Sequence, residues 1–371
     1  MSLGMTIFGP LIALIGLFLP PIEALLPKIS VIFYYKQLLI RRCFYLGGAV
    51  VIIISMLLRF DTLLLIALVI LCVIILLGEF VMVPTKIIPP LDRPVSKSLQ
   101  PGDLSEDTLV IGVKIGGLFR AYPLAILIPH HIVNDRIGET PVAATYCPAC
   151  RSGYIYNPVV KGKRLTFEPV TVRRRNMVMK DRETGTVWQH ETGTGLMGEF
   201  IGEKLEEINS EMCNWKTWIA EHPDTSVCFR PADYKNPSPM SHVFEKLLDH
   251  GPEHIVGPGI NGIDDRLPQH DFIIGLMVDG IPRAYPLSRL VEKKTISDNI
   301  GGVPIMLIYE EGANRVKAFR LPKGQENQTA LEGGRVRITE EVIMRSEKIP
   351  FVRQWWLAWS EYHPNSELFE E

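Results

Sequence analysis

Apolar residues are concentrated in three runs within the first 84 positions, whereas the rest of the chain mixes apolar and polar residues. The runs cover residues 5–19, 43–58 and 62–77. A helix needs about 20 predominantly apolar residues to cross a bilayer. The third run reaches this length if it continues through Val83, with Glu79 near the membrane surface. Because only residues 59–61 separate the last two runs, they predict a membrane-spanning helical hairpin. The first run ends at Pro20 and predicts a further span or a re-entrant segment.

Basic residues between the first two runs predict the orientation in the membrane. Lys28, Lys36, Arg41 and Arg42 lie there without any acidic residue. The positive-inside rule places this segment in the cytoplasm. Two further spans return the chain to the same side, so the soluble part is expected to be cytoplasmic. A different number of spans would make it extracytoplasmic. The sequence therefore predicts a multi-pass protein of the cell membrane whose partner is the lipid bilayer.

The soluble part contains an internal duplication. Residues 111–146 align without a gap to residues 274–309, and both segments contain Arg-Ala-Tyr-Pro-Leu. The pattern Trp-x-x-Trp-x-x-x-His-Pro then recurs from Trp215 and from Trp356. Two matches in the same order indicate two copies of one module. The predicted divisions are transmembrane helices at 1–84, a linker at 85–103, a first module at 104–230, a connector at 231–269 and a second, degenerate module at 270–371.

Short alternating runs predict the elements of one module. Gly116 and Gly117 separate two such runs, which is typical of a β-hairpin. Further strands are expected at residues 141–146, 154–172 and 177–190, and helices at residues 123–133 and from Trp215. Trp215, Trp218 and Ile219 form an apolar stripe that would pack on a sheet. The predicted fold class is α+β and β-rich, with N-terminal transmembrane helices followed by two tandem copies of a small sheet-plus-helix module.

Charge and cysteine content narrow the function. The net charge is −2 over 371 residues, so no nucleic-acid partner is expected. Four of the six cysteines lie in the soluble part, which is too few for a disulfide scaffold. Two of these form Cys147-Pro-Ala-Cys150 after a predicted strand, and the second copy lacks both thiols there. Thiols at this spacing can form a disulfide or bind a soft metal ion, with thiolate as the reactive form.

His130 and His131 precede the thiols on the predicted helix, and the second copy has Lys293 and Lys294 in their place. The histidines and thiols are thus lost together, which links them as one site. Imidazole and thiolate suit Zn, Cu or Fe, and they also suit a Cys–His acid–base pair.

Four more residues are candidates for binding a substrate or cofactor, namely Arg151, Arg175, Asn176 and Trp188. Arg151 follows the thiols and would stabilise a thiolate on Cys147. Arg175 and Asn176 end a cationic run that could bind an anionic substrate or a lipid headgroup, and the alternative is a solvated strand end. Trp188 would line a pocket or belong to the core.

Long ordered motifs carry a family resemblance. They lie at residues 112–124, 130–135, 145–150, 176–188 and 215–223. The stretch 110–227 resembles the family known as domain of unknown function 3179. This resemblance implies no activity, because none is established for the family. Its members often carry export signals, which opposes a cytoplasmic soluble part. The family has an acidic residue where this chain has His131, so a mechanism that needs the carboxylate is not expected here, whereas a metal site would gain a ligand.

Three functions follow from these features. In a thiol-dependent oxidoreductase, Cys147 would be the nucleophile, Cys150 would resolve it, and His130 would be the base. In a metal-binding protein without turnover, Cys147, Cys150, His130 and His131 would hold Cu or Zn. In a non-catalytic interaction scaffold, the thiols would be incidental. The sequence does not identify a protein or small-molecule partner.

Overall fold

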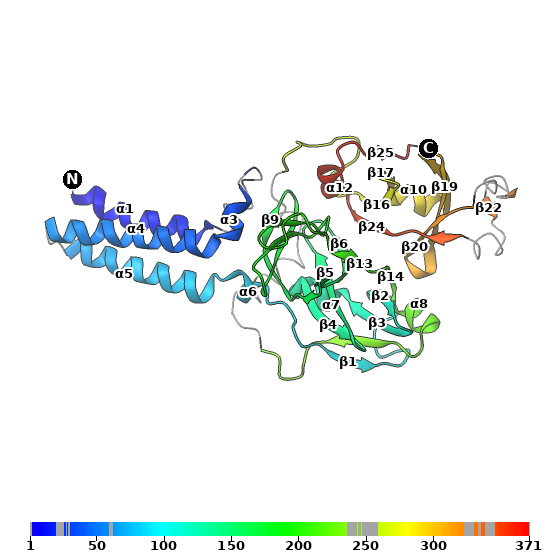
Figure 1. Cartoon of the computed structure of the whole chain (residues 1–371), viewed down its shortest axis with the longest axis horizontal. Coiled ribbons are helices and arrows are strands. Elements are labelled where there is room, and N and C mark those ends of the chain that lie inside the picture. The colour runs from blue at the N-terminus through cyan, green and yellow to red at the C-terminus, as the bar shows by residue number, and fades with distance from the viewer. Residues whose placement is uncertain are drawn as a thin grey trace.

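The computed structural model consists of an apolar helical bundle and a β-rich body (Figure 1). It describes residues 2–19, 26, 28, 30–58, 62–235, 243, 246, 259–322, 330–332, 335–337 and 346–370. The turn predicted at residues 59–61 and much of the predicted connector lie outside these residues. The predicted linker contains α6 (Pro84–Ile87) and β1 (Val95–Ser98), and β1 pairs with a strand of the first copy.

The helical bundle contains α1 (Ser2–Leu17), α4 (Gln37–Leu58) and α5 (Thr62–Leu76). The short helix α3 (Val31–Tyr35) comes directly before α4, and the π-helical turn η1 (Leu77–Val81) extends α5. Two helices, Gln37–Leu58 and Thr62–Val81, are long and apolar enough to cross a membrane. Close packing uses small residues, since a Cβ on Gly48 would lie 2.6 Å from the carbonyl oxygen of Gly9. Elsewhere large apolar side chains point outward, and Leu57 is 82% exposed.

The first copy forms the hairpin and the helix that its pattern predicts. Strands β2 (Leu109–Ile115) and β3 (Leu118–Pro123) join at Gly116 and Gly117, whose positive φ values suit a tight hairpin turn. Helix α7 (Leu124–His130) ends before residue 133 because His131 has a φ of 60°. The other elements are β4 (Ile132–Ile137), β5 (Thr140–Cys147), β6 (Ser152–Asn157), β7 (Val159–Val160), β8 (Lys163–Arg164), β9 (Phe167–Arg173), β10 (Asn176–Asp181), β11 (Val187–Gln189), β12 (Gly195–Met197), β13 (Glu206–Glu207), β14 (Ser210–Asn214), α8 (Trp215–Glu221) and β15 (Ser226–Phe229).

The second copy repeats the main pairings of the first. The strand order β24-β16-β17-β25 corresponds to β14-β2-β3-β15, and both contain one parallel pair, β17 with β25 and β3 with β15. In the first copy β1 adds a further strand outside β15. Its elements are β16 (Phe272–Val278), β17 (Ile281–Pro286), α10 (Leu287–Lys293), β18 (Thr295–Ile300), β19 (Val303–Glu310), the 3₁₀ turn η3 (Glu311–Ala313), β20 (Arg315–Arg320), β21 (Ala330–Glu332), β22 (Arg335–Arg337), β23 (Glu347–Lys348), β24 (Phe351–Trp355), α12 (Trp356–Tyr362) and β25 (Glu367–Leu368).

The five larger sheets have a propeller-like arrangement, so the predicted tandem arrangement of two separate modules is wrong. The mixed, β-rich α+β class is confirmed. One apolar cluster contains Cys147 and Cys150 of the first copy together with Trp355 of the second. Arg315 of the second copy also pairs with Glu221 of the first. The copies share a core because each leaves apolar surface that only the other covers.

Candidate functional site

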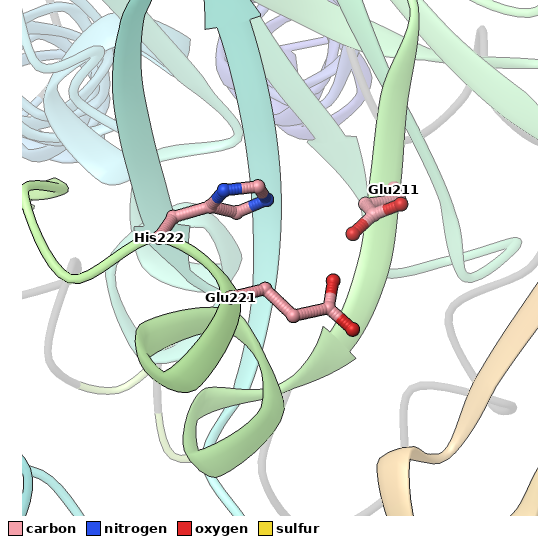
Figure 2. Close-up of side chains that lie close together, drawn as sticks. All are labelled: Glu211, Glu221 and His222. Atoms are coloured by element: carbon pink, nitrogen blue, oxygen red, sulfur yellow. The ribbon is translucent and has the colours of Figure 1, made fainter.

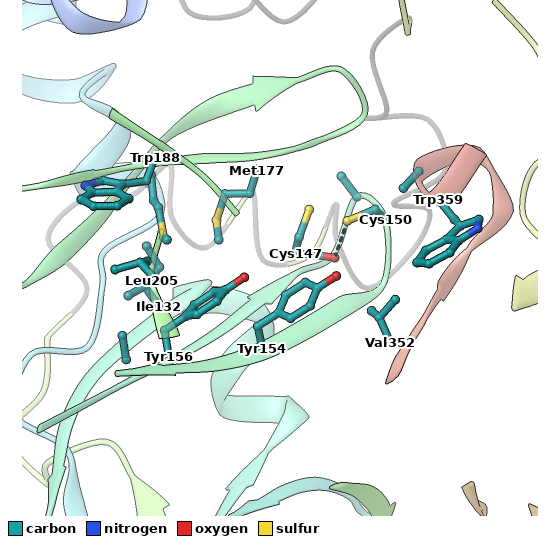
Figure 3. Close-up of a cluster of buried hydrophobic side chains, with 14 of the residues drawn as sticks. Ile132, Cys147, Cys150, Tyr154, Tyr156, Met177, Trp188, Leu205, Val352 and Trp359 are labelled. Carbon is teal, nitrogen blue, oxygen red and sulfur yellow. Dashed lines mark hydrogen bonds between the residues drawn. The ribbon is translucent and has the colours of Figure 1, made fainter. Parts of the chain in front are cut away.

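The two thiols lie at the end of β5 and in the turn that leads to β6. Cys147 and Cys150 are free and almost fully buried. The carbonyl oxygen of Cys147 accepts hydrogen bonds from the backbone N–H groups of Cys150 and Arg151, at 3.3 and 2.8 Å. Arg151 has a φ of 60°, which turns the chain into β6. Figure 3 shows the pair above the rings of Tyr154 and Tyr156. The turn thus holds both thiols in one buried cluster.

Polar groups surround the second thiol. Sγ of Cys150 lies 3.0 Å from Oγ of Ser152 and accepts a hydrogen bond from Nδ2 of Asn176 at 3.1 Å. Burial raises the pKa of Cys150 well above its ordinary value, and contact with the Cys147 thiol adds to this effect. Cys150 is therefore a neutral thiol that needs a base before it can act as a nucleophile. The guanidinium of Arg151 lies over the ring of Trp355 at 5.4 Å.

A buried carboxyl group continues this network. Nδ2 of Asn176 also donates to Oε2 of Glu191 at 2.9 Å, and Nε2 of Gln354 donates to Oε1 of Glu191 at 2.6 Å. Oδ1 of Asn176 accepts from Gln189 at 3.0 Å, which fixes the orientation of the amide. Glu191 is 7% exposed. The network therefore links the Cys150 thiol to a carboxyl group and to the second copy.

The protonation of Glu191 is poised near neutrality. Burial raises the pKa of Glu191 to about 7, while hydrogen bonds from Gln354 and Tyr154 oppose part of this rise. Such a pKa suits a group that accepts and releases protons at physiological pH. Sequence reasoning missed Glu191, which lies three positions after Trp188. The stretch around it is polar, so its burial could not be inferred from the local pattern.

Glu191 also lines a cavity of about 270 Å³ between the copies. Tyr154 and Tyr156 form part of its wall, with ring centroids 5.6 Å apart. Trp359 and His363 of the second copy form another part. The carboxyl group that is linked to Cys150 is thus also accessible to a small molecule in this cavity.

The repeated Trp/His motif shapes two cavities. The ring of Trp218 covers Gly112, where a Cβ would lie 2.2 Å from the indole, and Trp359 covers Gly275 in the same way. His222 lines a second cavity, of about 470 Å³, as His363 lines the first. Contact with these tryptophans places both histidines: the ring centroid of His222 lies 4.3 Å from Trp218 in an edge-on arrangement, and that of His363 lies 4.0 Å from Trp359 in a tilted one.

The two histidines predicted to join the thiols have other partners. Nδ1 of His130 lies 2.6 Å from the carbonyl oxygen of Pro89, and Nε2 accepts from Nε of Arg230 at 2.7 Å. Both ring nitrogens of His130 are therefore engaged. Nδ1 of His131 lies 2.8 Å from the carbonyl oxygen of Ile128, and burial lowers the pKa of His131 to about 4.

Among the described residues, a single group of three His, Cys, Asp or Glu side chains brings its ligand atoms within 4.8 Å of one another. It consists of Glu211, Glu221 and His222, shown in Figure 2. Arg315 donates to Glu211 at 3.0 Å and to Glu221 at 2.7 and 2.6 Å. This buried guanidinium already neutralises the carboxylates, which disfavours a metal cation there.

The residues that the sequence predicted to bind a substrate or cofactor lie in different places. Asn176 lies in the network, next to Cys150. Arg175 donates to the carbonyl oxygens of Gly262 and Leu357, each at 3.2 Å, and so connects the first copy to later segments. Trp188 is fully buried, and its indole N–H donates to Asp181 at 2.9 Å.

Neither a curated protein nor a solved structure matches the chain. A family described as "Protein of unknown function (DUF3179)" matches residues 85–366, about three quarters of the chain. The match runs from α6 through the first copy and through the second as far as the residue before β25, so the family unit includes the site and the cavity between the copies. The chain therefore belongs to this family of unknown function, as its motifs predict.

Proposed function

We propose that the protein is a membrane-anchored thiol–disulfide oxidoreductase in which Cys147 and Cys150 form the redox pair. The observation that carries this proposal is the hydrogen-bonded connection from the Cys150 thiol through Asn176 to Glu191. A neutral, buried thiol requires a proton acceptor, and Glu191 has a pKa suited to that task. Glu191 thus takes the role that the sequence assigned to His130, whose ring nitrogens are engaged elsewhere.

The proposed substrate is a disulfide, which supplies the oxidising equivalents. Sγ of Cys147 attacks one sulfur of the substrate, so the substrate S–S bond breaks, a mixed disulfide forms, and the other substrate sulfur leaves as a thiol with the proton that Cys147 loses. Cys150 then attacks Sγ of Cys147, which forms the Cys147–Cys150 disulfide and releases the second substrate thiol. Because the Asn176 amide donates to both groups and cannot carry a proton between them, Glu191 accepts the proton of Cys150 directly in this step and returns it to the departing thiolate. The two protons and two electrons of the protein dithiol thus end on the two substrate thiols.

Access is the main requirement of this scheme. Cys147 is 1% exposed and shares its apolar cluster with Trp355. The backbone N–H of Trp355 donates to the carbonyl oxygen of Cys150 at 3.0 Å. The second copy therefore has to move relative to the turn before a disulfide can reach the thiols. The cavity at Glu191 reaches the network and offers a route to it.

The metal-binding alternative has less support. In the described part of the chain, no three of Cys147, Cys150, His130 and His131 bring their ligand atoms within 4.8 Å. A structural Zn site typically uses four ligands. The scaffold alternative would not explain why a buried thiol and a buried carboxyl group share one hydrogen-bond network. The glutathione experiment distinguishes metal binding and a scaffold role from redox chemistry.

We also propose that the helical bundle lies in the bilayer. Its support is the length and apolar composition of two helices, together with outward-facing residues such as Leu57 and Val69. In water these side chains would form a large exposed apolar surface. The basic residues just before and within the first turns of α4 support a cytoplasmic β-rich body under the positive-inside rule. A reducing cytoplasm would keep the pair as a dithiol until a disulfide substrate arrives.

The proposal is tested by equilibrating the detergent-solubilised full chain in reduced and oxidised glutathione, followed by alkylation and mass measurement. We expect a reversible loss of two hydrogens that maps to Cys147 and Cys150 and is absent in Cys147→Ser and Cys150→Ala. Cys213 and Cys228 serve as internal controls because both are buried in the same body. Persistent thiols, or stoichiometric Zn or Cu that is lost in Cys147→Ser, would overturn the redox proposal.

A further inference from the structure

A cavity of about 450 Å³ lies between the helical bundle and the β-rich body. Its walls come from α3, the first turns of α4, residues 83–85, β9 and the end of β10. In Figure 1, α3 and α6 lie between the bundle and β9. The helices Gln37–Leu58 and Thr62–Val81 both have their body-proximal ends here. If they cross a bilayer, the cavity lies at the level of the lipid headgroups.

Two lysines give this cavity unbalanced positive charge. Lys36 and Lys180 line it, and in the described part of the chain neither forms an ion pair with a carboxylate. In the described part of the chain, the ammonium of Lys36 lies 4.9 Å from the centroid of the Tyr35 ring. Glu168 is the acidic residue among the described lining residues, and Arg182 donates to it at 3.1 Å. An anion in the cavity would therefore meet two ammonium groups.

Two arginines add to this charge. Arg41 and Arg42 also line the cavity, and both reach the same carboxylate, Glu79, at 3.4 and 2.8 Å. One carboxylate cannot neutralise two guanidinium groups. The arginines therefore contribute a further net positive charge beside the lysines.

The cavity combines this charge with apolar and aromatic groups. Leu38 and Leu39 line it and are 48% and 59% exposed. Tyr34 is 1% exposed and packs with Val170 of β9, which fixes α3 against the sheet. Tyr35 lines the cavity at the same level. Aromatic side chains, exposed leucines and cations in one place are typical of a membrane–water interface.

We propose that this cavity binds the headgroup of an anionic phospholipid, with its acyl chains along Leu38 and Leu39. The phosphate would meet Lys36 and Lys180, and the exposed leucines continue the apolar surface of the bundle. A lipid fits better than free phosphate because the cationic groups and the apolar groups line the same cavity. This inference rests on the proposed membrane anchoring.

Native mass spectrometry of the full chain from mixed phosphatidylcholine and phosphatidylglycerol micelles tests this inference. We expect one phosphatidylglycerol to be retained in preference to phosphatidylcholine. The double variant Lys36→Gln/Lys180→Gln should lower the retained fraction about tenfold, since each cation contributes to headgroup attraction. Lys161→Gln/Lys163→Gln is the matched control, because these lysines lie on the β7–β8 hairpin and pair with Glu203 and Glu199.

Three results would overturn the lipid site. Equal retention of the two lipids, an unchanged retained fraction in Lys36→Gln/Lys180→Gln, or displacement of the lipid by millimolar inorganic phosphate each contradicts it. Carbonate extraction of cell membranes separates this failure from failure of the anchoring. A chain that stays in the membrane without preferring phosphatidylglycerol refutes the lipid site alone. A chain that carbonate releases refutes both proposals.

Discussion

The turn after β5 and the turn after β19 have similar backbones and different chemistry. Arg151 and Asn314 both have positive φ, 60° and 46°, at matching positions. In the first copy the turn presents two buried thiols. In the second, Glu311 lies at the surface and pairs with Lys294 at 2.8 Å. The module thus builds this turn without cysteine, so the thiols of the first copy are available for chemistry that the fold does not require.

The two copies also differ in how deeply they bury a shared polar triad. Asp135 accepts from Arg120 and from the hydroxyl of Tyr122, and its side chain is 7% exposed. Asp298 makes the same contacts with Arg283 and Tyr285, but it is 14% exposed, and Arg283 also pairs with Glu367. A buried charge that loses its partner costs far more than an accessible one.

The largest expected effect is therefore a difference in how much stability the protein loses when each of these aspartates is replaced. Asp135→Ala should lower the free energy of unfolding by about 4 kcal/mol, because Arg120 would remain buried without its partner. Asp298→Ala should cost about half as much, since Arg283 keeps Glu367. Urea titration of tryptophan fluorescence measures both. Equal losses would show that burial does not distinguish the copies.

The second prediction concerns Glu191, the buried carboxyl group that shares the Asn176 amide with Cys150. Its pKa is about 7 in the folded chain and about 4.5 when unfolded. The unfolded chain therefore releases this proton first, and stability falls as pH rises from about 4.5 to 7, by about 3 kcal/mol. Glu191→Gln should flatten this dependence. Glu139→Gln is the control because its side chain is 98% exposed. A wild-type slope retained in Glu191→Gln would contradict the raised pKa.

The smallest expected effect comes from giving the first copy the residue that the second copy has at the position of Cys150. Cys150 aligns with Ala313, so Cys150→Ala reproduces the natural thiol-free turn. We expect a loss of about 1 kcal/mol from the small cavity left behind, with the fold retained. Circular dichroism and urea titration check this. Loss of the folded state would show that the thiol is structural after all.

The helices and strands of each copy could be predicted because turn residues and short apolar patterns within the sequence determine them. Gly116 and Gly117 sit in the hairpin turn, and the Trp/His motif forms a helix in both copies. The packing of the copies could not be predicted, because sequence similarity shows that two segments fold alike without showing how they meet. The contact between Gln354 and Glu191 joins residues 163 positions apart, and no local sequence pattern predicts it.

The candidate site was predicted in part for the same reason. The spacing of Cys147 and Cys150 identified the thiol pair, and the motif ending at Trp188 contained Asn176. The partners of His130 come from Pro89 and Arg230, which are far apart in the sequence. The joint absence of the histidines and the thiols from the second copy linked His130 to the thiols, but the orientation of its ring depends on these distant segments.

The pH dependence of disulfide formation tests the central claim most directly. The reduced full chain is mixed with oxidised glutathione between pH 5 and 9, and the rate of Cys147–Cys150 disulfide formation is followed by quenched mass measurement. We expect the rate to rise with an apparent pKa near 7, because Glu191 accepts a proton only when ionised. In Glu191→Gln this rise should disappear and the rate at pH 8 should fall at least tenfold. An identical profile in wild type and Glu191→Gln, or no disulfide at any pH, would contradict the account.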